Sequence, residues 1–262
     1  MNLMSTGKEN IILNGNPKKT FYKAVYNKHT NFGIQKFRID YSGQKNISYN
    51  DQNVFEFKID RIADMMQDTY LSVTIPPIYS GYWKRRSEDN SSDVYIPYHF
   101  RWIEELGISF IQEIEIFSSG TLLEKISGEY LKCLKERDYT LTKKSIHDKM
   151  TGNITELKNP ELNNISKKYP NAIYKNTTSI EPSIPGKTLL IPLEFWFSQS
   201  PKVALPLIAL QYTELTIRVT LRPIHELYTI NDIKNITDAQ ASSGDFLQVA
   251  PNTNEPLHSI FN

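Results

Sequence analysis

The sequence contains a single cysteine, Cys133, and no excess of charge of either sign. One cysteine excludes an intrachain disulfide, so we expect the chain to fold in a reducing compartment. Lysine and arginine number 30 against 29 aspartate and glutamate, which removes the electrostatic argument for a nucleic-acid or acidic-membrane partner. We therefore expect partners to be recognised by shape, with no specific nucleic acid among them.

Long hydrophobic runs are also missing. The first 15 residues lack the apolar run of a signal peptide. The longest apolar stretch, residues 203–210, is interrupted by Pro206 and is far shorter than the ~20 residues that span a bilayer. These features predict a soluble protein.

Metal-binding spacings do not occur. None of the five histidines belongs to an HExxH or HxH motif or pairs with the cysteine at ligand spacing; they are His29, His99, His147, His225 and His258. Metal sites need convergent ligands, so we interpret these histidines as structural or surface residues. We predict no metal and no cofactor.

Catalytic motifs are equally scarce. Gly186, Lys187 and Thr188 resemble the end of a phosphate-binding loop, but Glu181 stands where the first glycine is required, so we predict the start of a strand. Cys133 has lysines on either side but no partner base, and we interpret it as a buried or half-buried inert thiol. There is no GxSxG motif. We predict no catalytic residue and no enzyme.

What the sequence does have is aromatic residues and alternating patterns. Residues 187–223 contain two amphipathic strands, each with one apolar face: Leu189, Ile191, Leu193 and Phe195 in the first, and Leu215, Ile217, Val219 and Leu221 in the second. Pro192 indicates an edge position or a bulge. The connector between them is too hydrophobic for a free loop. We expect it to pack at one end of a sandwich and to hold the two strands in register.

Further strands follow from the same alternation. They are predicted at residues 36–41, 54–59, 69–75, 109–117 and 121–126, and the last two form a hairpin around residues 118–120. A short helix is predicted at 127–137 with Ser127 as its cap, whereas 79–98 and 138–186 are predicted loops. The pattern predicts an all-β, antiparallel sandwich with long loop insertions, and its long connections favour jelly-roll or Greek-key wiring over an up-and-down barrel.

Two surface features leave alternatives open. The basic run at residues 84–86 has Tyr82 and Trp83 beside it, and we interpret it as a solvated loop, with a nucleic-acid or sugar patch as the alternative. Six Asn-x-Ser/Thr sequons start at Asn46, Asn90, Asn153, Asn164, Asn176 and Asn235. Chance explains them in an Asn-rich chain, and non-secretory glycosylation is the alternative.

Two segments carry longer motifs. The first is an Asn-Pro start followed by a TFYKxVY core and an HTNF end, carried by Asn16, Pro17, Thr20, Phe21, Tyr22, Lys23, Val25, Tyr26, His29, Thr30, Asn31 and Phe32. The second is carried by Pro192, Phe195, Trp196, Phe197, Ala204, Leu205, Pro206, Leu207, Ile208, Ala209, Leu210, Gln211 and Tyr212. Together they resemble the major capsid proteins of nucleocytoplasmic large DNA viruses: the first is similar to that family's N-terminal signature and the second to the closing motif of its first jelly roll. Both motifs stand in the expected order.

The resemblance implies a structural protein with two jelly rolls, whose homotrimers form pseudo-hexagonal capsomers of an icosahedral shell. It implies neighbouring capsomers and minor capsid proteins as partners, an internal membrane nearby, and a place in the virion after assembly in the host cytoplasm. We divide the chain into an N-terminal arm (1–16), a first jelly roll (17–228) and a connector (229–262) toward a missing second one. It is either the N-terminal part of a longer protein or a short paralogue.

Two other functions stay open beside the capsid subunit. One is a capsid-related scaffold that shapes the immature virion membrane. The other is a carbohydrate-binding jelly-roll module that stacks sugars on Tyr82, Trp83 or Trp102. For the capsid subunit, the loops at 79–98 and 138–186 are our candidates for outward-facing or intersubunit contacts, and 1–16 for an inward arm.

Overall fold

A computed structural model describes residues 31–43, 47–87, 89, 92–161, 173–176, 179–233, 235–238, 240 and 246–259. The chain divides into two compact units, residues 1–38 and 39–262. In the first unit only residues 31–38 are described, and they form neither helix nor strand. The predicted arm at 1–16 and the first capsid-like motif up to residue 30 lie outside the described residues.

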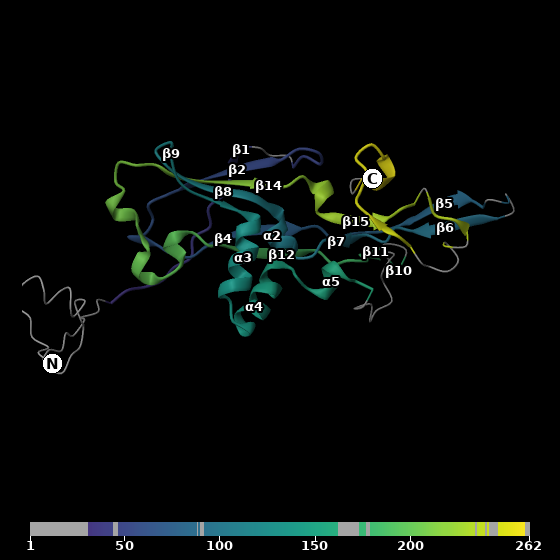
Figure 1. The fold of residues 1–262 in the computed structure, drawn as a ribbon, viewed down its shortest axis with the longest axis horizontal. Helices are drawn as coiled ribbons and strands as arrows, with labels where there is room; N and C mark the ends of the chain where they lie inside the picture. The colour runs from purple at the N-terminus through teal and green to yellow at the C-terminus, as the bar shows by residue number, and fades with distance from the viewer. Residues whose placement is uncertain are drawn as a thin grey trace, which may run out of the picture. The chain divides into compact units, whose positions relative to one another are not determined.

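The largest sheet of the second unit is antiparallel and has five strands in the order β1-β2-β14-β8-β9 (Figure 1). Their bounds are Ser42–Gly43 (β1), Asn53–Ile59 (β2), Leu215–Leu221 (β14), Ile111–Ser118 (β8) and Thr121–Ser127 (β9). In the central strand, Val219 lies opposite Phe55 on one side and Ile114 on the other. The apolar side chains of β14 are all buried, as their alternation predicts.

The opposing layer consists of β4 (Thr69–Ile75) and β12 (Lys187–Leu193), paired antiparallel with Lys187 opposite Ile75. The inner side chains of both layers belong to one hydrophobic core. Within the described part of the chain, β4 is the only strand paired with β12, so the edge position predicted from Pro192 is confirmed. The two strands of the 187–223 segment therefore lie in different sheets, and their connector crosses between the layers.

The hairpin and the short helix are both confirmed. Between β8 and β9 the turn places Ser119 at φ 46° and Gly120 at φ 82°, the positive values that a tight two-residue hairpin needs. After β9, helix α3 (Gly128–Asp138) begins where the Ser127 hydroxyl accepts a hydrogen bond from the Tyr130 amide. The strand predicted at 109–117 begins only at residue 111, because Leu106–Phe110 form helix α2.

The predicted loop at 79–98 is wrong. It contains a hairpin of β5 (Tyr82–Arg86) and β6 (Asp93–Pro97), which projects away from the large sheet in Figure 1. Exposed and half-buried positions alternate along β5, but the charged side chains hide that period from a reading based on hydrophobicity. Cross-strand contacts of Lys84 with Tyr95 and Asp93 stabilise the pair.

The predicted loop at 138–186 is also wrong. It contains helices α4 (Leu141–Thr151) and α5 (Thr155–Lys158) and the short strands β10 (Ile173–Asn176) and β11 (Ser179–Glu181). Helix α4 buries only His147 and Thr151, so its sequence has no apolar stripe. The residues at its two ends indicate the helix instead: Thr140 caps the first turn, and Gly152 ends the helix at φ 79°.

The strand predicted at 36–41 is absent, although this part of the chain is described. Within residues 36–43 only β1 is a strand, paired with β2, and Phe37 and Tyr41 are exposed. The prediction failed because an alternating pattern does not show whether a partner strand is within reach. Tyr41 nevertheless packs edge-on against Phe55, with 5.1 Å between ring centroids.

Short elements complete the unit. The strands are β3 (Met65–Met66) with β13 (Leu205–Pro206), and β15 (Tyr228–Asn231) between β7 (Arg101–Trp102) and β16 (Gln248–Val249). The 3-10 turns are η1 (Trp196–Ser198), η2 (Pro201–Val203), η3 (Leu207–Ala209), η4 (Ile224–Glu226) and η5 (Pro256–His258). Strands β15 and β16 had not been predicted; the domain boundaries at 16 and 228 stay a prediction.

Candidate functional site

A buried ion triad joins the three helices that follow β7 and β9. The ammonium group of Lys135, on α3, lies 2.7 Å from a carboxylate oxygen of Glu105 and 2.6 Å from one of Asp148, on α4, and the lysine side chain is 5% exposed. Partial burial alone would raise the pKa of both carboxyl groups, but the hydrogen bonds and charge of Lys135 hold each pKa below its usual value. Each charged group of the triad has a partner of opposite charge, so the triad is a structural clamp.

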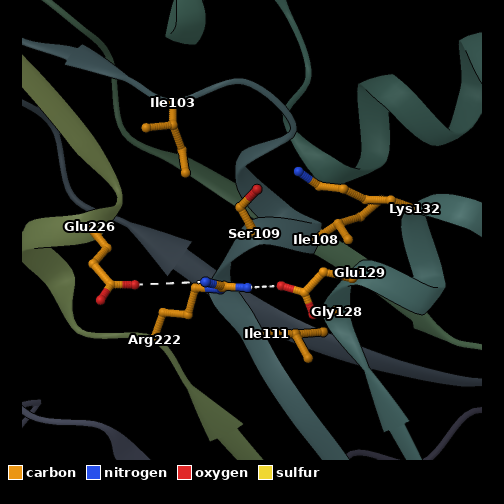
Figure 2. Close-up of a pocket in the computed structure, with 9 residues that line it drawn as sticks. All are labelled: Ile103, Ile108, Ser109, Ile111, Gly128, Glu129, Lys132, Arg222 and Glu226. Atoms are coloured by element: carbon orange, nitrogen blue, oxygen red, sulfur yellow. Dashed lines mark hydrogen bonds and ion pairs between the residues drawn. The ribbon is translucent and has the colours of Figure 1, made fainter.

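A pocket of about 170 Å³ lies beside this clamp, between α2, α3 and the chain after β14 (Figure 2). Its apolar wall is formed by Ile103, Ile108 and Ile111. Figure 2 shows the guanidinium of Arg222 between Glu129, with which it forms a hydrogen-bonded ion pair, and Glu226 at 3.7 Å.

Several polar side chains of this pocket have partners within the chain. A backbone amide at the start of α3 lowers the pKa of Glu129, and Arg222 adds to this effect. The Ser109 hydroxyl donates to the carbonyl of Glu104, and Lys132 lies 3.5 Å from Glu105. None of the nine lining residues is a histidine or a cysteine.

A second pocket, of about 290 Å³, lies between α4 and the end of β12. The Tyr139 hydroxyl donates to Glu194, and burial together with this bond raises the pKa of the tyrosine. The Lys143 ammonium lies 3.6 Å from the centroid of the Tyr139 ring. These contacts hold the connection between α3 and α4 against the end of β12.

The four histidines with a described position each contact different partners. His99 pairs with Glu161, His225 bonds to the Tyr49 carbonyl, and the His258 ring accepts from the Asn252 amide. His147 is buried against Tyr139, and burial lowers its pKa. Among the residues with a described position, no three His, Cys, Asp or Glu side chains group as metal ligands. His29 lies outside those residues.

Cys133 is exposed, so the prediction of a buried or half-buried thiol is wrong. The residue lies on the outer side of α3, where the helix buries Leu131 and Lys135 instead. The sequence Lys132-Cys133-Leu134-Lys135 does not show which side of a polar helix faces the core. Lys187 and Thr188 begin strand β12 directly after Gly186, as predicted.

Each face of the β5–β6 hairpin carries both aromatic and basic residues. Tyr82 and Tyr95 are exposed on one face, edge to face at 6.5 Å. Trp83 is half-buried on the other face, where Arg85 pairs with Asp238 at 2.7 Å. Trp102 is buried in the main core. Of the three rings considered as sugar platforms, only Tyr82 is therefore open.

The sequon asparagines are held in different ways. The Asn153 side chain is half-buried and donates to Asp148, whereas Asn235 is exposed and donates to Asp232. Asn176 lies in β10. The sequons at residues 46, 90 and 164 lie outside the described residues, and glycosylation remains untested.

The connector between β12 and β14 has a buried part and an exposed part. Phe195, Phe197 and Leu207 are buried in the core, which agrees with a connector packed at the sandwich end. In contrast, Ile208 and Tyr212 are exposed. Because β12 and β14 belong to different sheets, the connector does not hold them in register with one another.

This fold and its closing motif have counterparts in known proteins. A family model described as "Major capsid protein N-terminus" matches residues 20–255. The chain belongs to this major capsid protein family. Major capsid proteins of Chrysochromulina ericina virus (27% identical, 92% of this chain, 44% of the relative) and Phaeocystis pouchetii virus (29%, 93% and 45%) are similar to it. The chain thus spans about half the length of these curated relatives.

Solved structures confirm the all-β jelly-roll fold. A quasi-atomic model of the PBCV-1 virus capsid matches with a TM-score of 0.52 at 20% identity, over 85% of this chain and 42% of that one. A PBCV-1 capsid protein fitted into a reconstruction of the virophage Sputnik gives a TM-score of 0.51 at 21% identity, over 78% and 38%. The helices α2 to α5 are more extensive than the single short helix predicted.

Proposed function

We propose that this chain is a structural subunit of the capsid of a large DNA virus, which self-assembles into homotrimers that tile an icosahedral shell. The observation that carries the proposal is the match of residues 20–255 to the N-terminal part of major capsid proteins. The two-layered sandwich with one continuous core provides the rigid body that a shell subunit needs. Neighbouring capsomers and minor capsid proteins are its partners, and the virion assembled in the host cytoplasm is its location.

The domain division belongs to the same proposal. Residues 17–228 form the first jelly roll, and 229–262 lead toward a second set of strands. Strand β15 pairs with β7, so the connector begins against the first jelly roll. The protein acts by assembly and has no enzymatic role. In the described residues, no helix is both long and apolar enough to cross a membrane.

Mass spectrometry of purified mature virions tests this function. We expect the chain at a copy number comparable to other shell proteins, and cross-links between its copies. Its presence on immature membranes but absence from mature virions would instead establish the scaffold. Glycan-array binding together with absence from particles would favour the carbohydrate module and contradict the capsid subunit.

A further inference from the structure

One end of the sandwich carries a group of exposed apolar side chains. Two segments contribute: the chain after β2, and the connector between β12 and β14. We call the group the end surface; its members are Ile62, Met65, Pro206, Ile208 and Tyr212. Ile62 is 53% exposed, Met65 and Ile208 are each 59% exposed, and Tyr212 is 97% exposed. Scattered apolar residues are normal on a protein surface, but a contiguous set indicates an interaction site.

The contacts between the two segments bring these residues together. Strand β3 pairs with β13, so Met65 lies opposite Pro206. The Ile208 amide donates to the Asp64 carbonyl at 3.2 Å, and Arg61 donates to the Thr213 carbonyl at 2.8 Å. The members are therefore neighbours in space although more than 130 residues separate the segments in the chain.

The backbone beneath the end surface is ordered by its own hydrogen bonds. The Ser200 hydroxyl accepts from the Lys202 amide at the start of η2, and the Leu210 amide donates to the Leu207 carbonyl at the end of η3. Leu207 and Phe197 anchor the connector in the core. A surface fixed in this way loses little conformational entropy on binding.

The charges around the end surface distinguish between occupants. Asp60, Arg61, Asp64 and Asp68 belong to the segment after β2, Lys202 belongs to the connector, and all five are exposed. An acidic membrane needs an excess of basic residues, which this rim does not have. A rim with both signs can instead match a copy of itself, with acidic residues of one copy facing basic residues of the next.

We propose that the end surface binds a second copy of this chain and forms a contact between subunits. The inference rests on the proposed function, because a shell subunit requires contacts between copies. Beyond that function, the inference names the residues of one such contact: an apolar centre of Met65, Ile208 and Tyr212 with a rim of both charges.

Sedimentation equilibrium of the whole chain over a range of concentrations tests this contact. We expect the wild type to self-associate, and Ile208→Asp and Met65→Asp each to weaken association about tenfold or more. Leu122→Asp is the matched control, because Leu122 is 46% exposed on β9, outside the end surface. Chemical denaturation of all four proteins should agree closely, since the substituted positions are exposed.

A photo-cross-linking residue at position 212, used on mixed light and heavy isotope-labelled chains, identifies the occupant. Cross-links between light and heavy copies support the proposal. A wild type that stays monomeric, variants that associate as well as the wild type, or cross-links in virions only to a different protein each overturn it. In those cases the chain's presence in virions would still support the capsid function. Conversely, association lost in Ile208→Asp would support the contact even if virions lack the chain.

Discussion

The helical insert and the end surface differ in which kind of side chain is buried and which is exposed. The insert, α3 and α4, turns a lysine inward and compensates it with two carboxylates. The end surface turns apolar side chains outward, where nothing in the described chain covers them. A buried ion pair that lost one partner would destabilise the subunit itself, whereas an exposed isoleucine costs the monomer little. The insert therefore serves the fold, and the end surface is available for association.

The connector between β12 and β14 contains both kinds of residue, one that supports the fold and one that is free to associate. Phe195 is buried and Tyr212 is almost fully exposed. Phe195→Ala should lower the free energy of unfolding by about 3–5 kcal/mol, because a fully buried ring leaves a cavity, while Tyr212→Ala should change it by less than about 0.5 kcal/mol. Urea denaturation of both variants measures the difference. Equal losses would mean that the outer part of the connector also supports the fold.

The ion clamp is expected to give the next largest effect. Lys135→Met keeps the length of the side chain but leaves Glu105 and Asp148 partly buried without their cation. We expect a loss of about 2–3 kcal/mol, below the usual cost of a broken buried pair because both carboxylates are partly exposed. Lys132→Met, at a half-exposed lysine near the same Glu105, is the control and should cost little. If Lys135→Met lost self-association under conditions in which it remains folded, the insert would not serve the fold alone, and this result would contradict the contrast between the two regions.

Acid should weaken the helical insert. In the wild type the pKa of Glu105 and of Asp148 is lower in the folded state than in the unfolded state, so stability is lost as pH falls below the unfolded values near 4. Burial lowers the pKa of His147, which adds a loss below its unfolded value near 6.5. In Lys135→Met the carboxylates gain from protonation, so its deficit should be largest at pH 7 and smaller at pH 4. Thermal melts from pH 3 to 7 measure this, and a deficit independent of pH would contradict it.

The sequence predicted the parts of the fold whose apolar residues alternate. In strand β14 every second residue is apolar and buried. The capping hydroxyl of Ser127 indicates the start of α3. Helix α4 and the β5–β6 hairpin were not predicted because their contacts are polar: Lys135 with Asp148, and Arg85 with Asp238. Hydrophobic period alone carries no information about such pairs.

The end surface was predictable only in part. The hydrophobicity of the connector indicated that it packs, and Leu207 does. However, Leu207 and Ile208 are equally apolar neighbours, and only the 3-10 turn decides that one is buried and the other exposed. The contribution of Ile62 and Met65 depends on the pairing of β3 with β13, a contact between distant segments that no local pattern specifies.

The smallest predicted effect concerns the first turn of the insert. The Ser127 hydroxyl accepts from the Tyr130 amide at 3.2 Å, so Ser127→Ala leaves a helix-end donor without its partner and should cost about 1 kcal/mol. Ser127→Thr retains the hydroxyl and should recover most of that stability. Both variants should self-associate as the wild type does, because α3 contributes no residue to the end surface. Denaturation and sedimentation equilibrium of the same samples measure the two properties together. If the alanine variant lost association while the threonine variant kept it, the insert would take part in the subunit contact, and the contrast between the two regions would fail.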